Sequence, residues 1–141
     1  MGFVRLKTYI GLSKLHSAGR VTAEVYAEIM GFDLNMARMR LCQLRKSGLV
    51  TSSTGRSTHG RPKQWWVTEQ QMSDARRRCP DVARLEKVSM VCPATAAQVK
   101  SAAADEKNGP KWLARRLEEG LIVKRSEDEY VVPAGVAIYL L

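Results

Sequence analysis

Apolar residues recur at helical spacing in two segments near the start of the chain. In residues 4–18 they stand among polar residues at roughly helical spacing, and Gly19 follows where a helix-ending glycine is expected. The next segment begins after Thr22, whose hydroxyl group can cap a helix, and it ends at Gly31. The pattern predicts two helices joined by a short connection.

The most regular apolar spacing lies in residues 33–47. Asp33 is a favourable N-cap residue, and Gly48 follows the last turn. The apolar stripe consists of Leu34, Ala37, Leu41 and Leu44. Such a stripe predicts a third helix with one face in the core and the opposite face in solvent.

The pattern changes from helical to strand-like after Gly48. The runs "LVTSS" and "QWWVT" are rich in β-branched and aromatic residues, and Gly, Ser and Thr are frequent between them. We expect a β-hairpin whose loop spans residues 55–63. Side chains alternate across a strand, so Trp65 and Trp66 point to opposite faces, and at least one of them anchors the hairpin to the core.

The second half of the chain repeats parts of this pattern. "LARRLEEGLI" matches "LCQLRKSGLV", because in each a leucine stands seven residues before a glycine that leads into Leu-Ile or Leu-Val. An Ala-rich helix is expected from about Thr95, a further helix has Pro110 in its first turn, and "LIVKRSEDEYVV" predicts a second hairpin.

These elements predict a mainly α-helical fold with small β-hairpins, of the α+β class. We expect two winged helix-turn-helix domains in tandem, at residues 1–70 and 81–141, joined by a linker at residues 71–80. The alternative is a single winged helix followed by an α/β extension used for dimerisation.

The charge of the chain is concentrated in its first half. Residues 1–67 hold 11 Lys and Arg against 3 Asp and Glu, whereas residues 92–141 hold 7 of each kind. The net charge of +9 therefore favours a polyanionic partner for the first half. No apolar stretch is long enough to span a bilayer, so we expect a soluble, cytoplasmic and nucleoid-associated protein with no membrane partner.

Three helices followed by a basic hairpin is the element order of a winged helix-turn-helix. Over residues 5–70 the chain resembles bacterial regulators of the MarR and PadR kind, on the segments "LRKSGLV" and "GRPKQWWVTE". The resemblance implies a winged helix that binds double-stranded DNA. We expect a homodimer, because a dimer reads two half-sites.

The face of the third helix opposite its apolar stripe is the candidate DNA-reading surface. Amide, guanidinium and thioether side chains can contact base edges in the major groove, which makes Asn35, Met36, Arg38, Met39 and Gln43 candidate base readers. Arg40 and Lys46 suit phosphate contacts better. Outside this context, the same residues would be the solvated face of an amphipathic helix.

The basic hairpin loop supplies the remaining candidate DNA contacts. "HGRP" resembles the short Gly-Arg-Pro core with which minor-groove binders insert an arginine, so Arg61 is the candidate for that role. Arg56, His59 and Lys63 are placed on neighbouring phosphates. A solvated turn is the alternative interpretation.

Motifs for catalysis, cofactors and metals are missing from the sequence. The two histidines lie in unrelated contexts, and the three cysteines form no CxxC pair, so we predict no enzyme, no cofactor and no metal site. No small-molecule effector is assigned.

The leading hypothesis is a sequence-specific transcription regulator, such as a repressor. The alternatives are a replication, partition or architectural protein of a plasmid or phage, and a winged-helix protein-interaction module. The hairpin of the second half has an acidic tip that repels phosphate, at Glu127, Asp128 and Glu129, so we expect that half to contact protein.

Overall fold

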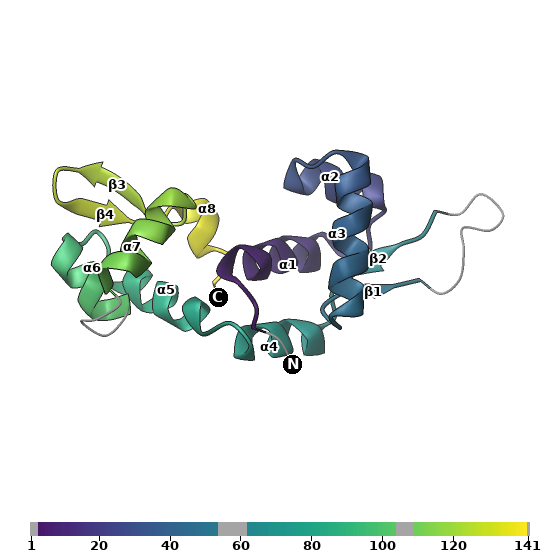
Figure 1. Cartoon of the computed structure of the whole chain (residues 1–141), viewed down its shortest axis with the longest axis horizontal. Coiled ribbons are helices and arrows are strands. Elements are labelled where there is room, and N and C mark those ends of the chain that lie inside the picture. Colours follow the sequence, from purple (N-terminus) through teal and green to yellow (C-terminus); the bar gives the residue numbers. More distant parts are fainter. Residues whose placement is uncertain (1–2, 54–61, 104–108, 141) are drawn as a thin grey trace. The chain divides into compact units, whose positions relative to one another are not determined.

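The computed structural model describes residues 3–53, 62–103 and 109–140. It contains two compact units, Met1–Cys79 and Pro80–Leu141, and each consists of helices and one small antiparallel hairpin (Figure 1). The expected fold class, mainly helical with small hairpins, is confirmed.

The first unit contains the three predicted helices, the hairpin and one further helix. In chain order these are α1 (Leu6–Ala18), α2 (Ala23–Met30), α3 (Leu34–Lys46), β1 (Thr51–Ser52), β2 (Trp65–Trp66) and α4 (Glu69–Arg77). The hydroxyl oxygen of Thr22 accepts a hydrogen bond from the Val25 amide and so caps α2. Gly31 ends α2 in the left-handed conformation, with φ of 71°.

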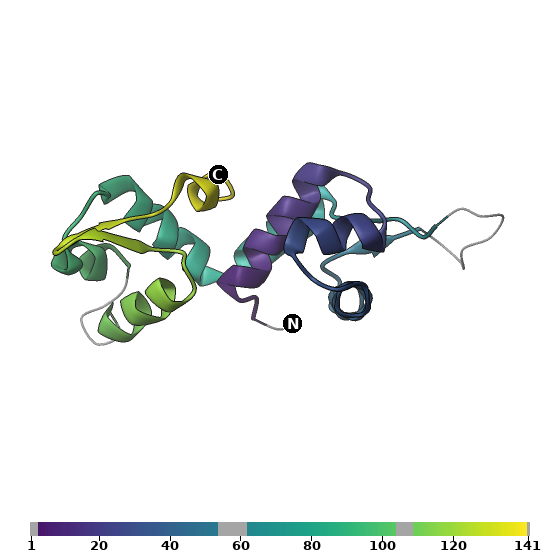
Figure 2. The ribbon, with the colours of Figure 1, turned by 90° about the horizontal axis from the view of Figure 1, so that it is seen from above.

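The core of the first unit is built around α1. Leu6, Leu12 and Leu15 of this helix are at most 2% exposed, and Ala37 and Leu41 of α3 are fully buried. In Figure 2, α3 is seen end-on while α1 and α2 lie in the plane of the picture, so α3 crosses α2 steeply. This is the arrangement of a helix-turn-helix.

The buried face of α2 does not include every apolar residue of the helix. Val25 is 41% exposed. Ala23, Tyr26 and Ala27 are buried instead. These three stand at positions i, i+3 and i+4, and the small alanines allow the helix to pack closely on that side.

A third short strand segment completes the sheet of the first unit. Val21, between α1 and α2, pairs with Trp65, and their backbone hydrogen bonds measure 2.9 and 2.8 Å. On its other side Trp65 pairs with Ser52 of β1. The hairpin is therefore attached to the helical core through its second strand.

Helix α4 occupies most of the segment that we expected to be a linker. Thr68 and Gln71 form a capping box at its start, and the side chain of Gln71 also bonds to Thr51 and to the Gly48 carbonyl oxygen. Ala75 is fully buried, and His16 of α1 bonds to Glu69 at 2.9 Å. The boundary between the units falls after Cys79, within the segment 71–80 that we expected to join them.

The second unit repeats the element order of the first. It contains α5 (Pro80–Val91), α6 (Ala96–Ala103), α7 (Gly109–Glu118), β3 (Val123–Ser126), β4 (Glu129–Val131) and α8 (Ala134–Ala137). Ala94, between α5 and α6, pairs with Tyr130 of β4 as Val21 pairs with Trp65. Thr95 and Gln98 form reciprocal capping hydrogen bonds at the start of α6.

The junction between the third helix and the hairpin recurs in atomic detail. Gly48 and Gly120 both have positive φ, of 77° and 76°. The following residue turns back in each unit, with hydrogen bonds of 2.9 Å from the Leu49 amide to the Leu44 carbonyl and of 3.0 Å from the Leu121 amide to the Arg116 carbonyl. These bonds support a tandem winged helix-turn-helix and align α3 with α7 at an offset of 72 residues.

Candidate nucleic-acid interface

Helix α3 is fixed at its start and along one face. The Asp33 carboxylate accepts a hydrogen bond of 2.8 Å from the Met36 amide, which caps the helix. Ala37, Leu41 and Leu44 are buried, as the apolar stripe predicted, and Leu34 is half-buried. The opposite face is consequently held at a defined orientation.

All five predicted base readers are exposed on α3. Asn35, Arg38 and Gln43 are exposed, and Met36 and Met39 are exposed by 46% and 57%. Helix α3 contains no acidic residue. The face therefore combines amide, thioether and guanidinium groups without a carboxylate.

The two arginines in the middle of α3 have different surroundings. Arg38 lies 3.9 Å from the Glu24 carboxylate of α2, and both side chains are about 60% exposed. Exposed pairs of this kind contribute little to stability. Arg40 is half-buried and donates a 2.9 Å hydrogen bond to the Thr8 hydroxyl of α1. Arg38 thus faces solvent, whereas Arg40 bridges two helices.

Arg40 also acts on Tyr26 within the core. Burial raises the pKa of the Tyr26 hydroxyl above its ordinary value, and the positive charge of Arg40 opposes that shift. Tyr26 is therefore neutral at physiological pH.

The base of the hairpin is surrounded by cationic side chains. Trp65 is buried, and the Lys63 ammonium group and the Arg45 guanidinium group lie 5.1 and 5.5 Å from its ring centre. The Arg20 guanidinium group lies 4.1 Å from the ring centre of Trp66. As predicted, one tryptophan, Trp65, belongs to the core. The Arg20 guanidinium group over Trp66 was not expected from the sequence.

Three of the predicted wing residues lie outside the described residues. These are Arg56, His59 and Arg61, whose proposed DNA contacts stay predictions. Lys63 lies at the end of the described part of the hairpin, where Ser53 and Gln64 exchange two hydrogen bonds of 2.9 Å. The described hairpin therefore ends in a closed pair of strands.

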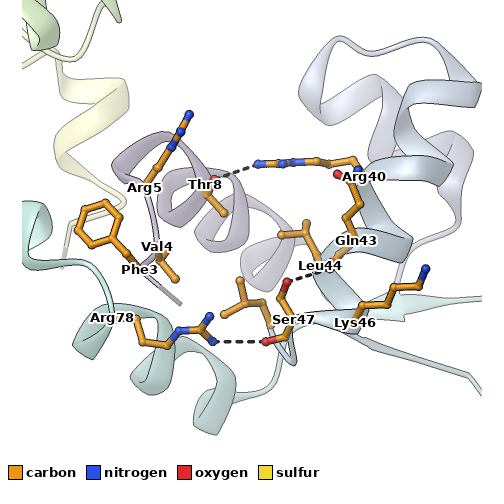
Figure 3. A pocket seen from close by; sticks show the side chains of 11 residues that line it. Phe3, Val4, Arg5, Thr8, Arg40, Gln43, Leu44, Lys46, Ser47 and Arg78 are labelled. Atoms are coloured by element: carbon orange, nitrogen blue, oxygen red, sulfur yellow. Dashed lines mark hydrogen bonds between the residues drawn. The ribbon is translucent and has the colours of Figure 1, made fainter. Parts of the chain in front are cut away.

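A cavity of about 690 Å³ adjoins the exposed face of α3 (Figure 3). Three predicted DNA contacts, Arg40, Gln43 and Lys46, line it. It is also lined by Arg5 near the start of α1 and by Arg78 just after α4, and Arg78 donates a 3.3 Å hydrogen bond to the Ser47 carbonyl oxygen. No lining residue is acidic.

Sequence reasoning missed the cations that come from outside α3 and the hairpin loop. Arg5, Arg20 and Arg78 lie far apart in the sequence, and no periodicity links them to α3. Arg20 follows Gly19, and its position beside Trp66 depends on the pairing of Val21 with Trp65. The position of Arg20 beside Trp66 therefore follows from a pairing between distant segments and not from the local sequence.

Helix α7 of the second unit corresponds to α3, but two of its large side chains are buried. Trp112 and Arg116 of α7 are 8% and 4% exposed. The indole N–H of Trp112 donates to the Asp81 carboxylate at 2.9 Å, and Arg116 donates to the same carboxylate at 3.1 Å. Arg84 completes the group with a 3.0 Å hydrogen bond to Asp81.

A second carboxylate adjoins Arg116. Its Nε atom lies 2.7 Å from the Glu119 carboxylate, and the two groups form an ion pair. Burial raises the pKa of Asp81, but the hydrogen bonds from Trp112 and Arg84 and the charge of Arg116 outweigh it, so the pKa is lowered overall. The network keeps Asp81 ionised.

Two other features are absent from the described residues. None of the described helices combines the length and the apolarity that crossing a lipid bilayer requires. Within the same ranges, no group of three or more His, Cys, Asp or Glu side chains is placed to hold a metal ion.

Comparison with known proteins identified a distant structural similarity. The chain is similar to a mutant of Lactococcus lactis ZitR, with a TM-score of 0.45 and 20% sequence identity, over 80% of this chain and 73% of that chain. No protein-family model and no curated protein matches the chain. A similarity at this level carries no functional conclusion, and the function proposed below follows from the described side chains.

Proposed function

We propose that the chain binds double-stranded DNA at a specific sequence and regulates transcription there. Helix α3 enters the major groove, and the basic hairpin contacts the adjacent minor groove or its phosphates. The observation that carries the proposal is the exposed face of α3, which has hydrogen-bonding and apolar groups but no carboxylate. The buried stripe of the same helix keeps this face rigid.

The chemistry of the face suits base edges. Asn35 and Gln43 present amides that can donate and accept toward adenine, and Arg38 can donate toward guanine. Met36 and Met39 leave large thioether side chains in solvent, where they gain nothing from the core. Contact with thymine methyl groups gives these methionines an apolar partner.

The phosphate contacts come from the cations around this face. Lys46 is exposed at the end of α3, and Lys63 lies at the hairpin base. Arg56, His59 and Arg61 of the hairpin loop are proposed to continue this contact, with Arg61 in the minor groove. Arg40 contributes positive charge while it holds α3 against α1.

The second unit is proposed to contact protein and to support a homodimer. Trp112 and Arg116 of α7 are buried, so they are withdrawn from any groove. The turn between β3 and β4 exposes Glu127 and Asp128, which repel phosphate. Ile138, 64% exposed beside α8, adds an apolar group for a protein partner.

The proposal is tested by selecting bound sequences from a random duplex library, followed by titration at several salt concentrations. We expect one preferred sequence and a steep loss of affinity with salt. Lys46→Gln should reduce the logarithmic salt slope by about one and leave the preference unchanged. Gln43→Ala should relax the preference at one base pair, by roughly 10- to 100-fold in discrimination.

The second unit provides a matched control for these variants. Arg115 occupies the position in α7 that Gln43 occupies in α3, and it is also exposed. Arg115→Ala should leave duplex affinity within about twofold of the original chain. Equal losses for the variants of α3 and α7, or no preferred sequence, would contradict the proposal. Protection of iterated repeats in a footprint would instead support a replication or partition protein.

A further inference from the structure

Two cations of the first unit lie against the ring of Trp65, where the end of α3 meets the base of the hairpin. The Arg45 guanidinium group lies 5.5 Å from the ring centre, and the Lys63 ammonium group lies 5.1 Å from it. Arg45 also donates a 3.3 Å hydrogen bond to the Ser52 hydroxyl oxygen of β1. Among the described residues, no carboxylate forms an ion pair with either cation. The two positive charges repel each other, and an anion between them relieves that repulsion.

Arg45 is held in place and still keeps most of its hydrogen-bond donors. A guanidinium group has five N–H donors, and the bond to Ser52 uses one of them. The ring of Trp65 attracts the positive charge of Arg45, and this tryptophan is itself only 4% exposed. An arginine fixed in this way loses less side-chain entropy when it binds a phosphate. Trp65 and Ser52 therefore prepare the exposed Arg45 for an acceptor in solvent.

The position of Arg45 extends the DNA-contacting face of α3 toward the hairpin. Arg45 lies seven residues after Arg38, which is two helical turns further along the same face. In the proposed function α3 occupies the major groove, and the hairpin contacts the adjacent minor groove. One sugar–phosphate backbone separates two adjacent grooves of a duplex. This backbone then passes the junction at which Arg45 and Lys63 meet.

The second unit builds the equivalent junction without an arginine. The offset of 72 residues between α3 and α7 places Leu117 at the position of Arg45. The same offset pairs Arg40 with Trp112, and each of these donates a 2.9 Å hydrogen bond to the first helix of its unit. This agreement supports the alignment. The end of the third helix can therefore pack beside its hairpin with an apolar residue at this position.

The position of Lys63 holds a carboxylate in the second unit. Asp128 stands two residues before Tyr130, as Lys63 stands two residues before Trp65, and both aromatic residues pair with the short strand that precedes the second helix. The Asp128 carboxylate accepts a 3.1 Å hydrogen bond from the Ala96 amide at the start of α6. The framework thus requires neither cation, and both are available in the first unit for a ligand.

We propose that Arg45 and Lys63 together bind the DNA backbone phosphate that lies between the major groove occupied by α3 and the minor groove contacted by the hairpin. The phosphate oxygens accept charge-assisted hydrogen bonds from the guanidinium and ammonium groups. This contact rests on the proposed function, to which it adds Arg45 and the identity of the phosphate. Because one phosphate is held at the junction, the pair fixes the spacing between the base pairs that α3 reads and those that the hairpin contacts.

The test replaces the phosphates of the preferred duplex, one at a time, with neutral methylphosphonates. Each replacement removes one negative charge and leaves the base sequence unchanged. For the original chain we expect one replacement, at the boundary between the two grooves, to weaken binding about tenfold. Arg45→Gln should weaken binding of the unmodified duplex by a similar factor and should no longer respond to that replacement. Lys63→Gln should lose its response to the same replacement.

The boundary between the grooves is located independently on the same duplex. The base pair whose preference changes in Gln43→Ala marks the major-groove contact, and protection from hydroxyl radicals marks the minor-groove contact. The phosphate that Arg45→Gln no longer senses should lie between these two marks.

Three further variants separate a phosphate contact from diffuse attraction and from a structural role. Lys7 is an exposed cation of α1, and Lys7→Gln should leave the response to every replacement unchanged. Arg45→Leu installs the residue of the second unit, so its circular dichroism and its urea midpoint should equal those of the original chain. Arg45→Lys keeps the charge and should retain the logarithmic salt slope that Arg45→Gln reduces by about one.

The possible failures distinguish this contact from the proposed function. If the original chain prefers one duplex but Arg45→Gln responds to every replacement as the original chain does, the contact is wrong and the proposed function stands. Different silent positions for Arg45→Gln and Lys63→Gln would also overturn the shared phosphate. An affinity loss that follows a lowered urea midpoint, with no silent position, would make Arg45 a structural brace only. A chain without any preferred duplex would overturn both proposals.

Discussion

The two units build the same succession of elements from side chains of opposite character. In the first, Arg40 reaches Thr8, and the surrounding cations have no carboxylate among the residues that line the cavity. In the second, Trp112 reaches Asp81, and the neighbouring arginine is paired with two carboxylates. Both units link their first and third helices by a side-chain hydrogen bond, and the link has a different chemical form in each.

The difference separates what maintains the fold from what is available for binding. The positions shared by the two units are the capping threonines, the glycines with positive φ and the short strand pairings. The charged residues on the third helix are not shared. A charged side chain that is paired with an opposite charge inside its unit contributes to the stability of that unit. A charged side chain without such a pair can instead attract a binding partner.

The largest effect is expected from breaking the network of the second unit. Asp81→Ala removes the acceptor of Trp112 and one partner of Arg116, whose side chain is only 5% exposed. We expect a loss of about 3 kcal/mol in the free energy of unfolding of this unit, because a buried charge loses a partner. Amide hydrogen exchange should show faster exchange in α5 and α7 and little change in α1 and α3.

A triple variant sharpens this comparison by installing the residues of the first unit in the second. Asp81→Thr, Arg116→Leu and Glu119→Ser reproduce Thr8, Leu44 and Ser47 at the corresponding positions. The triple variant should recover most of the stability lost in Asp81→Ala, since no buried charge remains unpaired. A triple variant as unstable as the single one would mean that the two sites are not equivalent.

Acid should weaken the second unit through the same carboxylate. The pKa of Asp81 is lower in the folded protein than its ordinary value of about 3.8, so folding favours the ionised form. This stabilisation is complete above that ordinary pKa and is lost as the pH falls through the lowered pKa of the folded state. Thr8, the counterpart in the first unit, does not titrate.

Urea unfolding between pH 6 and pH 2, with hydrogen exchange resolving the units, measures this dependence. The chain with Asp81→Asn should show a shallower loss of stability in the second unit than the original chain. Identical pH dependence of the two chains would exclude Asp81 as the titrating group.

The smallest effect on stability is expected at the exposed pair of Arg38 and Glu24. Glu24→Gln should change the free energy of unfolding by less than about 0.5 kcal/mol, because both side chains face water and are 3.9 Å apart. Duplex affinity should rise, since Arg38 loses its competing carboxylate. Glu28→Gln, on the same helix, is the control for net charge, and an equal rise there would show that the pair itself is unimportant.

The features that could be predicted from sequence are those encoded locally. Thr22 and Asp33 cap α2 and α3 as their chemistry suggests, and Gly31 and Gly48 stand where these helices end or turn. The regular stripe of α3 identified its buried face, and with it the exposed residues of the candidate interface. The hairpins followed from a change of period and from their turn residues.

The features that could not be predicted depend on contacts between distant segments. The pairing of Val21 with Trp65 and the docking of α4 through Ala75 join residues whose neighbours in sequence give no indication of their partners. We expected Arg40 to contact a phosphate because its position in the sequence places it beside the solvent-facing side of α3. Its bond to Thr8 depends on where α1 lies.

The closed base of the first hairpin makes its loop replaceable. Within the described residues, Ser53 and Gln64 are hydrogen-bonded to each other, and Trp65 is bonded to Val21 on one side and paired with Ser52 on the other. In the second unit a two-residue turn at Glu127 and Asp128 joins the equivalent strands. The sheet at the base of the hairpin therefore does not depend on the segment that connects Ser53 to Gln64, and a connection of another length or sequence can be inserted there without rebuilding the sheet.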